Sequence, residues 1–236
     1  MKMFVTGGSA SGKSEYAGRA AEKLAAGRPI LYIATLSDRS PESEARVARH
    51  DALRRAGNAV YVVKECFSLG DLAELEDLIK RGKLSGHDEP GGSGESGGPA
   101  LTDGVSAASC GAGGFGAIFL DSIDALTADI MFGTAPDFRQ PAGFEPESYA
   151  ELTAAAVLGI LDSAENAVAV IDDIFRGGGK YGASTREYIR YTALTGRKIA
   201  AGCGLAAEVI SGVPVILKGG EDEFPEIDSY HAVALH

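Results

Sequence analysis

Eight residues near the start of the chain have the types and spacing of a phosphate-binding loop. They fit G-x-x-x-x-G-K-[ST], and they lie between a short apolar run and a stretch typical of a helix. In such a loop the backbone N–H groups surround phosphate oxygens, the lysine reaches the β- and γ-phosphates, and the hydroxyl can ligate Mg²⁺. We expect Mg²⁺ and ATP or GTP, which no base-reading motif distinguishes, to bind at Gly7, Gly8, Ser9, Ala10, Ser11, Gly12, Lys13 and Ser14.

A second magnesium ligand is expected at the end of a later apolar run. Asp121 closes the sequence A-I-F-L-D and would face the metal if that strand lies beside the first strand. An acid at this position can instead cap the following helix, a role for which Ser122 competes. Asp172 and Asp173 end another apolar run and are alternative metal ligands.

A histidine between two arginines is the third candidate for chemistry. Arg46, His50 and Arg54 are spaced four residues apart, so on a helix they share one face. A neutral imidazole between two guanidinium groups can attack phosphorus, while the arginines stabilise the developing charge. The alternative is a solvated, charged helix face.

The elements that position these residues alternate between strands and helices. This order predicts an α/β fold with a mainly parallel sheet flanked by helices, of the RecA-like P-loop NTPase type. The apolar patterns predict strands at residues 2–6, 29–35, 58–63, 117–121 and 167–173, helices at 12–26, 41–56, 69–80, 123–132, 147–164 and 184–201, and a final strand or hairpin at 208–218.

A Gly/Ser-rich stretch interrupts this alternation at residues 82–114. It has too little apolar content to offset the entropy of ordering, so we expect a flexible, disordered insertion. The whole chain, residues 1–236, is then expected to form a single nucleotide-binding domain.

Composition excludes several classes of function. The net charge of −11 opposes general binding to nucleic acid, while local cations can still hold a small phosphorylated ligand. The cysteines at 66, 110 and 203 are too few for a disulfide framework and form no C-x-x-C pair. With no signal-peptide layout and no apolar run of membrane-spanning length, we expect a cytoplasmic protein that binds no membrane.

Several of these motifs together resemble a known enzyme family, the bifunctional adenosylcobinamide kinase/adenosylcobinamide-phosphate guanylyltransferases of cobalamin biosynthesis. The resemblance rests on V-T-G-G at 5–8, S-G-K-S at 11–14, Y-I-A-T at 32–35 and the Arg46, His50, Arg54 spacing, with further similarity at 119–132 and 210–218. It implies that Lys13 and Ser14 bind phosphate and Mg²⁺, that GTP guanylylates His50, and that Asp121 stands where the family commonly has a glutamate. It also implies nucleotide and corrinoid substrates and a homotrimer.

The chain departs from the family pattern in its second half. D-D-I-F at 172–175 replaces the usual N-E-V-G, the helix at 184–201 matches poorly, and the Gly/Ser-rich insertion is unusual. Two alternatives therefore stand beside the bifunctional enzyme. One is a P-loop kinase of a small molecule that lacks guanylyl transfer, and the other is a nucleotide-binding regulatory protein with little turnover.

Overall fold

The computed structural model describes residues 1–37, 48, 59–82, 84, 114–133, 143–176, 179–227 and 233–234. Strands and helices alternate along the chain, as the sequence predicts. The strands are β1 (Lys2–Gly7), β2 (Ile30–Ala34), β3 (Tyr61–Glu65), β4 (Ala117–Asp121), β5 (Ala167–Asp172), β6 (Leu205–Ile210), β7 (Val213–Lys218) and β8 (Val233–Ala234); the helices are α1 (Lys13–Ala25), α3 (Leu69–Lys80), α4 (Ile123–Phe132), α5 (Pro146–Leu161) and α6 (Ala183–Gly202), with a short 3₁₀ turn at Glu221–Glu223.

The strands form a single sheet of mostly parallel strands. Within the described residues it has eight strands, in the order β3-β2-β4-β5-β1-β6-β7-β8. The six strands from β3 to β6 in this order are parallel, while β7 pairs antiparallel with β6 and β8 pairs parallel with β7. Parallel strands end at one edge of the sheet, so the residues after β1, β2, β4 and β5 are brought together there.

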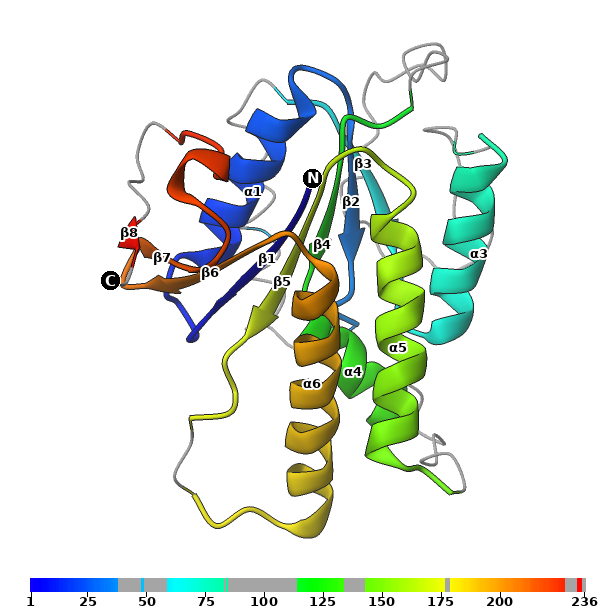
Figure 1. Cartoon of the computed structure of the whole chain (residues 1–236). Helices are drawn as coiled ribbons and strands as arrows, with labels where there is room; N and C mark the ends of the chain where they lie inside the picture. Colours follow the sequence, from blue (N-terminus) through cyan, green and yellow to red (C-terminus); the bar gives the residue numbers. More distant parts are fainter. Residues whose placement is uncertain are drawn as a thin grey trace.

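Helices cover both faces of the sheet (Figure 1). On one face, α1 packs through Tyr16 and its alanines against alternate side chains of the central strands. On the other face, α3, α4, α5 and α6 enclose a larger apolar cluster that includes Leu72, Leu126, Val157 and Ile199. This arrangement confirms the predicted α/β class, and it explains why the central strands are apolar on both faces.

Local sequence signals explain several element boundaries. Helix α3 occupies the predicted residues 69–80 and begins with a capping box, in which Ser68 accepts a hydrogen bond from the Asp71 N–H and the Asp71 carboxylate accepts one from the Ser68 N–H. At the other end of the chain, the stretch expected to form a final strand or hairpin is a hairpin, with Ser211 and Gly212 at its turn. Both turn residues have positive φ, 50° and 83°, which the turn requires.

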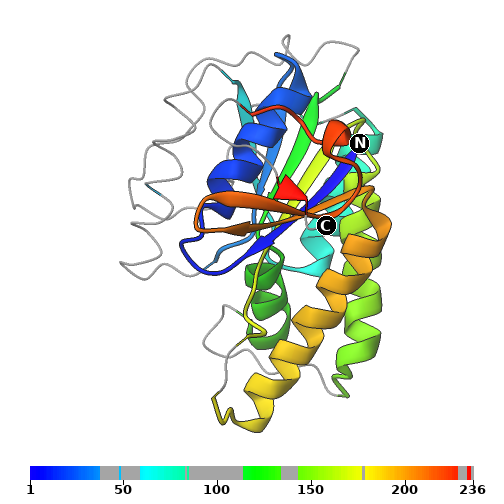
Figure 2. The same cartoon turned by 60° about the vertical axis from the view of Figure 1, so that its left-hand side comes forward.

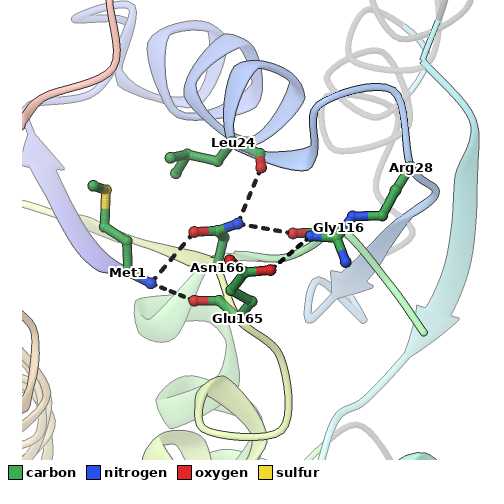
Figure 3. Close-up of polar contacts among 6 residues, drawn as sticks. All are labelled: Met1, Leu24, Arg28, Gly116, Glu165 and Asn166. Atoms are coloured by element: carbon green, nitrogen blue, oxygen red, sulfur yellow. Dashed lines mark hydrogen bonds and ion pairs between the residues drawn. The ribbon is translucent and has the colours of Figure 1, made fainter. Parts of the chain in front are cut away.

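One side chain ties three elements together at the amino edge of the sheet (Figure 3). The Asn166 amide nitrogen donates to the Leu24 carbonyl at 3.0 Å and to the Gly116 carbonyl at 3.2 Å. Its Oδ1 accepts from the Met1 amino group at 3.3 Å. Asn166 thereby links the start of β5 to the end of α1 and to the segment that enters β4.

One predicted boundary differs in the structure, and the strand neighbourhood on which the metal role of Asp121 depended is not found. The third strand begins at Tyr61 rather than at residue 58, where the chain lies outside the described residues. Strand β4 is not beside β1, because β5 lies between them. The helix predicted at 41–56 is described only at Ala48, and the insertion predicted at 82–114 only at Gly82, Leu84 and Gly114, so these two predictions remain open.

Candidate active site

The phosphate-loop motif forms the turn between β1 and α1. Two of its residues, Ala10 and Gly12, have positive φ, 57° and 91°. The Ser11 N–H donates to the Gly8 carbonyl at 3.1 Å, and the Tyr16 N–H closes the first helical turn onto the Gly12 carbonyl at 3.0 Å. The motif therefore has the strand, turn and helix context that phosphate binding at a helix N-terminus requires.

The loop is supported from the side by the β6–β7 turn (Figure 2). The Gly212 N–H donates to the Ser11 carbonyl at 2.8 Å. The Ser11 hydroxyl is buried and has no hydrogen-bond partner in the described part of the chain. It lies so close to Gly7 that a Cβ there would come within 2.6 Å of the hydroxyl oxygen, which explains the glycine at this position.

Lys13 is turned into the protein and pairs with an acid. Its side chain is 8% exposed, and its Nζ forms an ion pair with Asp172 Oδ1. The Gly8 carbonyl lies 3.5 Å from the same nitrogen. Asp172 closes β5 and is level with Gly7 in the register of the two neighbouring strands.

Ser14 contacts Asp121, the acid that the sequence predicts as a metal ligand. Its hydroxyl donates to Asp121 Oδ1 over 3.4 Å, although β4 lies one strand further from β1 than the prediction assumed. This long hydrogen bond places a hydroxyl and a carboxylate oxygen side by side at the carboxyl edge of the sheet. Both are hard oxygen donors of the kind that Mg²⁺ prefers.

Thr35 fixes the segment that carries Asp121. It is fully buried and follows β2, and its hydroxyl donates to the Ser122 carbonyl at 2.6 Å and accepts from the Ser122 N–H at 2.7 Å. The Thr35 N–H also donates to the Asp121 carbonyl at 3.4 Å. Thr35 therefore holds the backbone that directly follows the Asp121 side chain.

A second acid, Asp124, contacts the backbone of Asp172. Asp124, in the first turn of α4, accepts a hydrogen bond from the Asp172 N–H at 2.9 Å. Burial raises the pKa of the Asp124 carboxyl, and the negative charge of Asp172 raises it further. The Asp124 backbone carbonyl accepts from the Tyr188 hydroxyl at 3.0 Å, which fixes this turn against α6.

Asp173 has a different environment from its neighbour. Its carboxylate pairs with Arg176 over 2.6 Å, and the same guanidinium reaches Glu208 on β6, also over 2.6 Å. The two successive acids therefore separate: Asp172 contacts the lysine of the phosphate loop, and Asp173 contacts an arginine on the other side of the strand end.

The described residues do not form a metal site from protein ligands alone. Among them, no group of three or more His, Cys, Asp or Glu side chains has an arrangement that could hold a metal ion. A serine and one acid are nevertheless sufficient for Mg²⁺ when phosphate oxygens and waters complete its octahedron, as is usual in nucleotide sites.

The predicted site residues fall into two sets. Lys13, Ser14, Asp121 and Asp172 meet at the carboxyl edge of the sheet, whereas the predicted catalytic residues Arg46, His50 and Arg54 lie outside the described residues. Sequence reasoning assigned no site role to Thr35 or Asp124. The sequence signals for these two residues are weak: Thr35 is a threonine that follows an apolar strand, and Asp124 is an acid in the first turn of a helix.

A comparison with protein families matches part of the chain to a known family. Residues 3–76 match the model of the family described as cobinamide kinase / cobinamide phosphate guanyltransferase. A search of curated proteins found no match for the chain. The matched stretch contains the phosphate loop, β2, β3 and the segment with Arg46, His50 and Arg54, and it ends before Asp121 and Asp172.

The match confirms the family resemblance predicted from the sequence. It indicates a nucleotide-binding transferase of cobalamin biosynthesis on a P-loop fold. No helix in the parts of the chain that are described is both long and apolar enough to cross a membrane.

Proposed function

We propose, from the family match over residues 3–76, that this enzyme catalyses two successive transfers to a corrinoid. In the first, the aminopropanol hydroxyl of adenosylcobinamide takes the terminal phosphate of ATP or GTP. In the second, adenosylcobinamide phosphate takes GMP from a second molecule of GTP, and pyrophosphate is released.

The observation that carries the first step is the arrangement around the phosphate loop. Lys13 and Ser14 lie at the start of α1, where backbone N–H groups point out of the helix, and Asp121 contacts Ser14. In the proposed reaction the hydroxyl oxygen forms a bond to the γ-phosphorus and releases its proton to solvent, the bond to the β–γ bridging oxygen breaks, and a nucleoside diphosphate leaves. Lys13 stabilises the charge on the transferred group.

Magnesium fits the oxygen donors of this site. Ser14 and Asp121 would hold it, and when bound it neutralises charge on the phosphate oxygens. Thr35 keeps Asp121 in place through its two hydrogen bonds to Ser122.

The second step is assigned to His50. An imidazole nitrogen forms a bond to the α-phosphorus of GTP, and pyrophosphate leaves with the bonding electrons. A phosphate oxygen of adenosylcobinamide phosphate then attacks the same phosphorus, breaks the N–P bond and restores the histidine. Arg46 and Arg54, spaced to share a helix face with His50, are proposed to neutralise the oxygens during both attacks.

The guanylyl step is tested by covalent labelling. Purified protein is incubated with Mg²⁺ and GTP labelled at the α-phosphate, denatured, and separated on a gel. We expect acid-labile label on the wild type and on the control His87→Ala, and none on His50→Ala. Equal labelling of His50→Ala would reject the histidine assignment.

The kinase step is tested separately with GTP or ATP labelled at the γ-phosphate and adenosylcobinamide. Lys13→Met should abolish transfer because it removes the charge at the phosphates, whereas Lys23→Met, which changes an exposed lysine of the same helix, should retain it. Phosphate transfer without any histidine label would support the alternative of a kinase that lacks guanylyl transfer. Nucleotide binding without either transfer would support the regulatory protein.

A further inference from the structure

Lys13 is the cation that would bind the nucleotide phosphates, and in this structure it already forms an ion pair with Asp172. The two side chains are 8% and 20% exposed, so water screens the pair only weakly. A phosphate that approaches Lys13 must therefore compete with a carboxylate that is already in contact with it.

The charges around Asp172 determine how unfavourable it is to break its ion pair with Lys13. Asp124 lies directly behind it and accepts a hydrogen bond from the Asp172 N–H, and Asp121 ends the neighbouring strand β4. Once Lys13 binds phosphate, Asp172 has lost its counterion, while the Asp124 carboxyl remains close to it and Asp121 lies at the end of the adjacent strand. An unpaired, poorly solvated carboxylate beside other carboxylates is unfavourable.

We propose that Asp172 is the counterion of Lys13 in the nucleotide-free protein and makes nucleotide binding depend on a divalent cation. When Lys13 binds phosphate, the Asp172 carboxylate loses its partner. A divalent cation that binds together with the phosphates then compensates its negative charge in place of Lys13. The site thereby rejects metal-free nucleotide. This inference rests on the proposed function, because it presumes that nucleotide phosphates bind at Lys13.

The neighbouring acid provides the matched control. Asp173 is one residue further along the chain, but it pairs with Arg176, which also contacts Glu208. Phosphate bound at Lys13 leaves that pair intact. Removing the charge of Asp173 should therefore leave the metal dependence of binding unchanged, although the net charge of the protein changes by the same amount.

The test is the dissociation constant of ATP, measured by titration calorimetry in Mg²⁺ and in EDTA, for wild type, Asp172→Asn and Asp173→Asn. We expect Asp172→Asn to bind metal-free ATP about tenfold more tightly than wild type, which corresponds to about 1.4 kcal/mol, and to depend less on Mg²⁺. Asp173→Asn should behave like wild type. Asp172→Ser provides a second neutral side chain should the asparagine variant fold poorly, as judged by circular dichroism.

The outcomes separate the inference from the proposed function. If wild type binds ATP but both neutral variants at 172 keep its affinity in EDTA, or bind more weakly, this inference fails and the proposed function stands. The same holds if Asp173→Asn shows an equal gain, because a general charge effect would then explain the result. If no variant binds ATP, or GTP in a parallel titration, with or without Mg²⁺, the proposed function fails and the inference fails with it.

Discussion

The Thr35 hydroxyl donates to the Ser122 carbonyl and accepts from the Ser122 N–H, so one small side chain satisfies two buried backbone groups. The backbone that it holds also carries Asp121, which contacts Ser14 of the phosphate loop. A threonine at the end of β2 therefore supports a contact between β4 and α1. Side chains that position a metal ligand in this way often affect metal affinity without touching the metal.

We predict that Thr35→Val lowers both stability and magnesium affinity. Valine keeps the shape but leaves the Ser122 N–H unpaired, which should cost about 1–3 kcal/mol. The Mg²⁺ concentration that gives half-maximal phosphate transfer should rise because Asp121 is less well fixed. Both quantities are measurable, by urea denaturation and by magnesium titration of the activity.

Thr195→Val is the control for this prediction. Thr195 is also fully buried, but its hydroxyl bonds to the Tyr191 carbonyl within α6 at 2.9 Å, away from the site. Its substitution should leave the magnesium titration unchanged. If Thr35→Val gives the wild-type titration as well, Thr35 has a structural role only.

At the scale of elements, the amino edge of the sheet depends on Asn166. Its amide joins the end of α1, the entry to β4 and the start of β5. We predict that Asn166→Asp destabilises the fold by about 2 kcal/mol, because a carboxylate cannot donate to the Leu24 and Gly116 carbonyls and would lie against them. The free energy of unfolding in urea measures this effect.

The adjacent Glu165 gives the comparison. It forms an ion pair with Arg28 over 2.9 Å, but both side chains are substantially exposed, 72% and 40%. Exposed ion pairs contribute little to protein stability, so Glu165→Gln should change the free energy of unfolding by less than about 0.5 kcal/mol. Equal effects of the two substitutions would show that charge at this edge, rather than the amide network, determines stability.

At the scale of the whole molecule, buried tyrosines on both faces of the sheet should limit stability at high pH. Burial raises the pKa of Tyr16 and of Tyr188 from 10.0 to about 12, and it raises the pKa of Tyr191 as well. Since the folded state holds these protons more tightly than the unfolded chain does, their contribution is complete below pH 10 and is lost as the pH rises toward 12.

We therefore predict that the free energy of unfolding falls steeply between pH 10 and pH 12, by up to about 3 kcal/mol for Tyr16, which is 1% exposed. Urea denaturation at several pH values measures the slope. Tyr16→Phe should show a shallower slope than wild type. An identical slope would show that Tyr16 does not control the alkaline loss.

Sequence and tertiary structure determine different features of this protein. Local patterns are sufficient for the phosphate loop, the alternation of elements and the bounds of α3, since backbone propensity and capping act between residues near in sequence. Sequence also identifies Ser14 and Asp121 as metal ligands, a role that remains a prediction. The helix that would carry His50 remains a prediction too, because it lies outside the described residues.

Tertiary structure decided which acid contacts which cation. From sequence, Asp121, Asp172 and Asp173 are alternatives, because each ends an apolar strand. Strand order and register then assign Asp121 to Ser14 and Asp172 to Lys13, while Asp173 pairs with Arg176, three residues further along the chain. The physical reason is that the Ser14–Asp121 and Lys13–Asp172 contacts join residues more than a hundred positions apart, and only the packing of the sheet fixes those distances.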